Sequence, residues 1–193
     1  MEINVQKDTE IIEQFVRSFG KYDDLLVPDY YDPITESFAI ENQDQSEQRH
    51  WQPLRKQTGR DKLESVYSKL PNHLPPMFEE LLLTFRWAGV DLERFYLHAN
   101  PLGNDLSGFE KEVFKDRGLS SALIEGGFVQ FGKAAEFNYD PICFNTRKHL
   151  GDGDCPIVQL DHEEILCNFR LKEVGQLAPS FRNLVVSIVQ DAT

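Results

Sequence analysis

Two short runs near the end of the chain carry side chains that could hold a metal ion: Asp152-Gly153-Asp154 and Asp161-His162-Glu163-Glu164. Carboxylates and imidazoles are the usual ligands of divalent cations in hydrolytic enzymes. The spacing is poor, because Leu166 stands where an H-E-x-x-H helix has its second histidine, and the first run lacks the later ligands of an EF-hand. We therefore predict no metal site, and we interpret the residues as parts of turns. A metal-dependent hydrolase remains the weakest functional alternative.

No other pattern predicts an enzyme. The chain lacks G-x-S-x-G, G-x-x-x-x-G-K-[ST] and G-x-G-x-x-G, and its other histidines have no spacing that suggests a shared site. The odd number of cysteines, without a C-x-x-C pair, favours a reducing compartment, and Cys143 and Cys167 are interpreted as small core residues within strands. The sequence therefore predicts a cytoplasmic, non-catalytic protein that needs no cofactor.

Four short segments have the composition of β-strands, being rich in β-branched and aromatic residues and separated by turn-forming ones. They are Phe128–Phe131, Tyr139–Phe144, Pro156–Leu160 and Ile165–Leu171. In the last, apolar residues occupy every second position, which is the period of a strand with one apolar face. The turns between the segments predict that consecutive strands pair as an antiparallel meander.

Helical periodicity surrounds these strands. The predicted helices are Ile11–Phe19 (after Asp8 and Thr9, with Gly20 as its stop), Leu63–Leu70, Phe78–Phe85 with Trp87 extending its apolar face, Leu106–Ile124, and Phe181–Ile188, and a further strand is predicted at Arg94–His98. We predict an α+β fold with a mainly antiparallel sheet and helices packed largely on one face. Residues 1–58 form an N-terminal helix and acidic extension in this prediction, and residues 59–193 form the α+β domain.

The acidic extension is the most distinctive surface feature. Between Tyr22 and Gln48 the chain has eight carboxylates, four interleaved aromatic residues and no Lys or Arg. The whole chain has 20 basic and 32 acidic residues and a formal charge of −12, which disfavours nucleic acid and anionic membranes as partners. We predict a basic protein partner, bound through Asp23, Asp24, Asp29, Tyr30, Tyr31, Asp32 and Phe38. The alternative interpretation is a solvated linker.

Several short sequence motifs occur in an order that resembles one known family. A helix opens with Leu74-Pro75 and is followed by Ala88-Gly89; a strand then leads into Gly132, Ile157–Leu160 precedes Asp161-His162-Glu163, and the chain closes with Ser180-Phe181-Arg182-Asn183-Leu184. Across residues 63–189 this order of motifs resembles the SUKH superfamily of bacterial toxin-immunity proteins and fungal cell-wall regulators. The chain departs from the family pattern in one loop residue, Ala88 in place of Asn, and in the absence of glycines from Lys133 to Asn138.

The resemblance implies a protein that binds and does not catalyse. It implies an immunity protein that sequesters a toxin domain, often a nuclease, by covering the active site of the toxin. A regulatory interaction scaffold is the second function that the family implies. An acidic inhibitor would suit a basic nuclease site, because complementary electrostatic fields raise the association rate.

Overall fold

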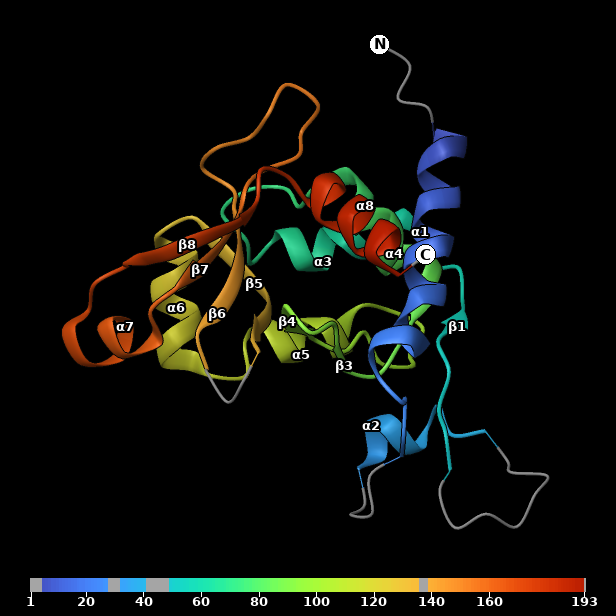
Figure 1. Ribbon diagram of the computed structural model, residues 1–193. Helices are drawn as coiled ribbons and strands as arrows, with labels where there is room; N and C mark the ends of the chain where they lie inside the picture. The colour runs from blue at the N-terminus through green and yellow to red at the C-terminus, as the bar shows by residue number, and fades with distance from the viewer. Residues whose placement is uncertain (1–4, 28–31, 41–48, 136–138, 193) are drawn as a thin grey trace.

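A six-stranded antiparallel sheet organises the protein in the computed structural model, which describes residues 5–27, 32–40, 49–135 and 139–192. Each strand pairs with the next along the chain, in the order β3-β4-β5-β6-β7-β8 (Figure 1). The strands are β3 (Val90–Asp91), β4 (Phe95–Leu97), β5 (Phe128–Ala134), β6 (Pro141–Asn145), β7 (Ile157–Leu160) and β8 (Glu173–Ala178). A separate antiparallel pair joins β1 (Leu54–Arg55) to β2 (Phe85–Arg86). The α+β class predicted from the sequence is confirmed, and so is the antiparallel pairing of the first three predicted strands, which are β5, β6 and β7.

Eight α-helices and one 3-10 turn lie within the described ranges. They are α1 (Val5–Tyr22), α2 (Pro33–Glu36), the 3-10 turn Arg60–Lys62, α3 (Leu63–Tyr67), α4 (Pro76–Thr84), α5 (Ser107–Val113), α6 (Arg117–Glu125), α7 (His162–Asn168) and α8 (Phe181–Asp191). Most of these helices contribute to one large core. Figure 1 shows α1, α4 and α8 grouped together, away from α6 and α7.

The alternation of side chains along the central strands assigns them to the two faces of the sheet. On β6, Ile142 and Phe144 belong to the main core, whereas Cys143 between them belongs to a second cluster on the other face. Aromatic rings concentrate in the main core, where Phe78 of α4 lies 4.8 Å from Phe144 between ring centroids. The helices therefore pack largely on this face.

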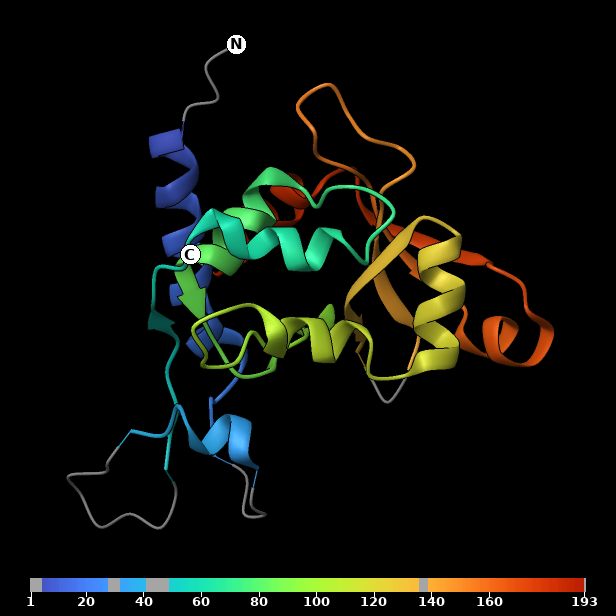
Figure 2. The ribbon, with the colours of Figure 1, turned by 180° about the vertical axis from the view of Figure 1, so that it is seen from behind.

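The second face is covered by α6 and α7. Leu119 and Leu123 of α6 and Ile165 of α7 pack with Phe128, Cys143, Val158 and Leu160 of the strands. Figure 2 shows α6 from behind, lying against the sheet. This smaller cluster leaves part of the face uncovered.

The N-terminal residues are part of the same core as the sheet. Ile12, Phe15 and Phe19 of α1 are buried in the main core, and the hydroxyl of Tyr22 donates a hydrogen bond to the carbonyl of Ile188 at 2.7 Å. The backbone N–H of Thr58 also donates to a carbonyl of α4. The boundary predicted between residues 58 and 59 therefore falls inside one packed unit.

The segment Ile165–Leu171, predicted to be a strand, is mostly helix. The carboxylate of Asp161 accepts a hydrogen bond from the backbone N–H of Glu164 at 3.0 Å, which caps the start of α7. The helix ends at Asn168, and the residue that follows, Phe169, has a left-handed backbone with φ of 52°. Only Ile165 is buried as predicted, whereas Cys167 and Phe169 are exposed. The helix cap outweighs the alternation, because a strand with so many exposed residues would bury little apolar surface against the sheet.

Other boundaries also differ from the prediction. The first helix begins before Asp8 and continues through Gly20, because its apolar face packs along α8 and α4. The helix α4 ends at Thr84, so that Trp87 lies beyond it, in a bridge with Asn100. The predicted helix 106–124 is two helices, with Asp116 capping the second, and the helix predicted to reach Leu70 ends at Tyr67.

Candidate functional site

An open hollow of about 450 Å³ lies where the end of α1 meets the turn between β3 and β4. We call it the acidic hollow, because four carboxylates line it together with three other residues: Tyr22, Asp23, Asp24, Leu26, Asp91, Glu93 and Ala135. Within the described residues, none of these carboxylates lies within 4.0 Å of a basic side chain. The hollow therefore presents negative charge that the surrounding side chains leave uncompensated.

Asp23 holds the two sides of the acidic hollow together. Its carboxylate accepts hydrogen bonds from the backbone N–H groups of Leu25 at 2.9 Å and Asp91 at 3.0 Å. Leu25 and Glu93 both have left-handed backbones, with φ of 50° and 61°. A residue with a side chain adopts this conformation at a cost of about 1–2 kcal/mol, so packing must hold both turns. Such positions concentrate at functional sites.

Tyr22 is affected by its burial and by neighbouring charges, of which Glu93 belongs to the hollow and Arg94 acts in the opposite direction. The pKa of its hydroxyl is raised above the usual value, first by burial and then by the negative charges of Asp191 and Glu93. The hydroxyl remains protonated and donates to α8 as described above. Tyr22 therefore serves as a neutral wall of the hollow, between carboxylates contributed by three parts of the chain.

Of the four predicted partner-binding residues that the structure describes, two lie in this hollow. Asp23 and Asp24 line it, whereas Asp32 caps α2 by accepting hydrogen bonds from the N–H of Ile34 at 3.1 Å and from the hydroxyl of Thr35. The other predicted contacts Asp29, Tyr30 and Tyr31 lie outside the described residues.

The prediction that Phe38 contacts a partner needs correction. Its side chain is 3% exposed and packs against Trp51, with ring centroids 6.1 Å apart. Backbone hydrogen bonds across Ala39 and Trp51 fix this part of the acidic segment to the chain that follows it. Phe38 is therefore a core residue that anchors the segment.

Two of the four carboxylates that line the hollow were not predicted from the sequence. Asp91 ends β3, 68 residues after Asp23, and Glu93 lies in the turn that follows. No local signal distinguishes these two carboxylates from other acidic turn residues. The contact between Asp23 and the backbone of Asp91 creates the site, and it arises only from tertiary packing.

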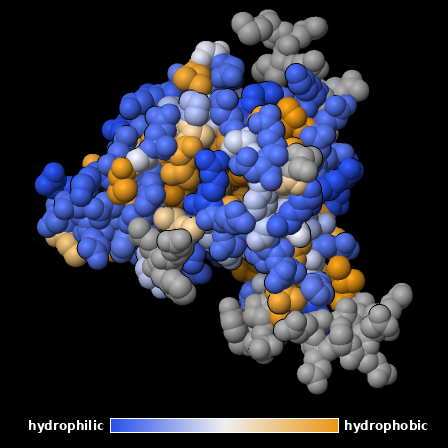
Figure 3. Space-filling model, viewed as in Figure 1, coloured by the Kyte–Doolittle hydropathy of each residue, from blue (hydrophilic) through white to orange (hydrophobic). Residues whose placement is uncertain are grey.

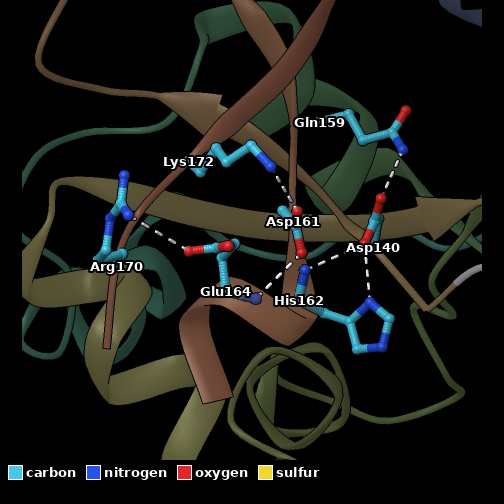
Figure 4. Close-up of polar contacts among 7 residues, drawn as sticks. All are labelled: Asp140, Gln159, Asp161, His162, Glu164, Arg170 and Lys172. Atoms are coloured by element: carbon cyan, nitrogen blue, oxygen red, sulfur yellow. Dashed lines mark hydrogen bonds and ion pairs between the residues drawn. The ribbon is translucent and has the colours of Figure 1, made fainter. Parts of the chain in front are cut away.

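The residues of the candidate metal cluster have separate structural roles. Asp154 accepts backbone hydrogen bonds at the start of α8, Asp161 caps α7 and pairs with Lys172 at 3.1 Å, and the Nδ1 of His162 lies 2.7 Å from Asp140 (Figure 4). His162 is the first residue of α7, which corrects its interpretation as part of a turn. In the ranges that the structure describes, no group of three or more metal-ligating side chains is placed to hold an ion.

The buried cysteines are poorly suited to nucleophilic chemistry. Burial raises the pKa of the Cys143 thiol well above its usual range. Burial, followed by the charge of Asp154, raises the pKa of Cys155 to about 12. Both are therefore protonated at neutral pH, whereas a cysteine nucleophile acts as the thiolate.

His98 predicts a specific dependence of stability on pH. Burial, followed by the charges of Lys133 and Lys115, lowers the pKa of His98 to about 4. The native state keeps this ring neutral as the pH falls from about 6.5 to 4, whereas the unfolded chain takes up a proton, so protonation lowers the free energy of the unfolded state relative to the native state. We expect His98 to remove about 1–2 kcal/mol of stability across this range, after allowance for its partial exposure.

The measurement compares urea denaturation of the wild type and His98→Gln at pH 6.5, 5.5 and 4.5. The variant should lose less stability on acidification, because the other titrating groups are shared. Parallel pH profiles for the two proteins would contradict the assigned role of His98.

No helix within the described ranges is long and apolar enough to cross a membrane. None of the protein-family models, curated proteins or solved structures with which the chain was compared matches it.

Proposed function

We propose that this protein binds a basic partner protein through the acidic hollow. The observation that carries the proposal is the convergence of Asp23, Asp24, Asp91 and Glu93 around one concavity, with no basic side chain at ion-pair distance in the described residues. A Lys or Arg side chain of a partner would supply the missing positive charge. Complementary charge of this kind sets the partner and its orientation and speeds the encounter.

The partner is a toxin domain, and the protein acts as a SUKH-like immunity protein that neutralises it. This step is supported by the resemblance of residues 63–189 to that superfamily and by the charge of −12. Nuclease active sites are basic because they bind phosphates, so an acidic surface that covers such a site inhibits without any chemistry. The function requires binding alone and assigns no catalytic residue to this chain.

The surface around the hollow suits a contact rich in polar groups. The face shown in Figure 3 is predominantly hydrophilic, with hydrophobic residues in separate patches. Within the described residues, the carboxylates of Asp24 and Glu93 form no hydrogen bond or ion pair. A partner can therefore reach them without first breaking a native contact. These two residues are the best positions for a test.

Reversing the charge of the hollow should slow association. In Asp24→Lys/Glu93→Lys, we expect the association rate with the toxin domain encoded beside the gene to fall at least about tenfold at low salt. The fall should shrink at physiological salt, where the Debye length is about 8 Å, and the dissociation rate should change less. Surface-plasmon kinetics at the two salt concentrations measure both rates.

The matched control is Glu125→Lys/Glu163→Lys, which changes the net charge equally at exposed positions on α6 and α7. It separates a local effect of the hollow from the net charge of the protein. Equal association rates for the two double variants would remove the acidic hollow from the proposed interface. The outcome would then assign recognition to another surface.

A further inference from the structure

A second pocket, of about 510 Å³, opens on the face of the sheet that α6 and α7 partly cover. Its lining includes Tyr96, His98, Lys115, Lys133, Tyr139 and His162, and we call it the tyrosine–histidine pocket. Its volume lies within the range of about 300–1,000 Å³ that is typical of small-molecule sites. The residues come from β4 and the position after it, the connection between α5 and α6, β5, the chain before β6, and α7, so the fold assembles the pocket.

Lys133 provides an available positive charge inside this pocket. It pairs with Tyr96 across β4 and β5, and its Nζ lies 4.8 Å from the centroid of the Tyr96 ring and 5.8 Å from that of Tyr139. These are cation–π distances, which hold an ammonium group without neutralising it. Among the residues described, no carboxylate lies within ion-pair distance of Lys133.

His162 is held in a fixed orientation at the opposite wall. The buried carboxylate of Asp140 lies 2.7 Å from its Nδ1 and also accepts hydrogen bonds from the His162 N–H at 3.0 Å and from Gln159 at 2.8 Å. Figure 4 shows the second ring nitrogen, Nε2, on the far side of the imidazole from Asp140. The Asp140 contact therefore leaves Nε2 as the ring atom that can meet a ligand.

The charges around the pocket favour an anion. Its two acidic lining residues are already engaged, since Glu112 lies 3.9 Å from Lys115 and Asp116 caps α6. Burial is the main cause that lowers the pKa of the nearby His98, and the positive charges of Lys133 and Lys115 add to it, so both ammonium groups act on the interior of the pocket.

We propose that the tyrosine–histidine pocket binds a small aromatic anion, a planar ring that carries a carboxylate or phosphate. Lys133 and His162 contact the anionic group, and the rings of Tyr96 and Tyr139 pack against the ring of the ligand. The proposal is independent of the acidic hollow, which shares none of these residues. The two proposals can therefore fail separately.

Calorimetric titration of the full chain tests the proposal with three probes: AMP, UMP and 4-hydroxybenzoate. We expect saturable binding of at least one probe, with weaker binding of the matching partial ligands, adenosine, phosphate or phenol. Lys133→Met should weaken that binding at least about tenfold, and His162→Gln should also weaken it. The absence of saturable binding for all three probes up to about 10 mM would overturn the proposal.

Lys148→Met is the matched control, because it removes the same charge from an exposed turn outside the pocket. Thermal melts of the three variants show whether each remains folded. A second measurement follows the imidazole nitrogen signals of His162 and His98 by NMR in the wild type during the titration. Equal affinities of Lys133→Met and Lys148→Met, or unmoved imidazole signals, would show that a probe binds elsewhere and would also overturn the proposal.

Discussion

Replacing Phe181 with alanine is expected to lower the free energy of unfolding by about 3–5 kcal/mol. The side chain is 1% exposed and lies at the start of α8, facing the main core. Its ring centroid is 5.1 Å from that of Phe78, 6.0 Å from Phe131 and 5.6 Å from Phe144. Truncation would open a cavity among three rings that belong to a helix and two strands, where the surroundings can relax only in part.

Urea denaturation followed by tryptophan fluorescence measures this loss. Phe169→Ala is the matched control, because Phe169 is 90% exposed and the chemical change is the same. Its effect should stay within about 0.5 kcal/mol, as for other surface substitutions. A loss of that small size for Phe181→Ala would contradict the packing of α8 against the sheet.

The elements that the sequence predicts correctly are those whose pattern and burial agree. The closing helix has apolar residues at helical spacing, and Phe181, Leu184, Val185 and Ile188 are all buried. The strands β5, β6 and β7 contain runs of β-branched and aromatic residues that pack on both faces of the sheet. In each case, local propensity and tertiary packing select the same structure.

The prediction of a strand after β7, at Ile165–Leu171, is wrong for the opposite reason. Of the alternating apolar residues in this segment, Ile165 alone is placed in a core, since Cys167 is exposed, Phe169 is almost fully exposed and Leu171 is 39% exposed. Asp161 followed three residues later by Glu164 is a helix-start signal that outweighs the alternation. This helix-start signal is visible in the sequence and would have predicted α7.

The candidate sites are less predictable because they depend on contacts distant in sequence. Asp23 and Asp24 stand out as part of an acidic run, but the turn that brings Asp91 and Glu93 beside them does not. The tyrosine–histidine pocket likewise draws on Tyr96, Lys133 and His162 from separate elements. Composition indicates the sign of the charge on a surface, whereas only the fold determines which charges meet.

Asp154 should make the second large contribution to stability, through the backbone of α8. Its carboxylate accepts hydrogen bonds from the N–H groups of Cys155 at 2.7 Å, Phe181 at 2.9 Å and Arg182 at 3.0 Å, and the residue is 4% exposed. The two bonds to α8 satisfy N–H groups that have no partner within the helix, and the negative charge lies at the positive end of the helix dipole. Asp154 therefore joins the turn before β7 to the helix that closes the core.

Asp154→Ala is expected to lower the free energy of unfolding by about 2–3 kcal/mol, because it leaves buried N–H groups without acceptors. Asp154→Asn, which keeps one acceptor oxygen, should lose less, and Asp152→Ala on the exposed side of the same turn should lose under about 1 kcal/mol. Urea denaturation of the three variants, with and without Mg²⁺, separates a helix cap from a metal ligand. A cap predicts the same order of stability in both buffers. Stabilisation of the wild type by Mg²⁺ that Asp154→Ala abolishes would instead support the hydrolase alternative.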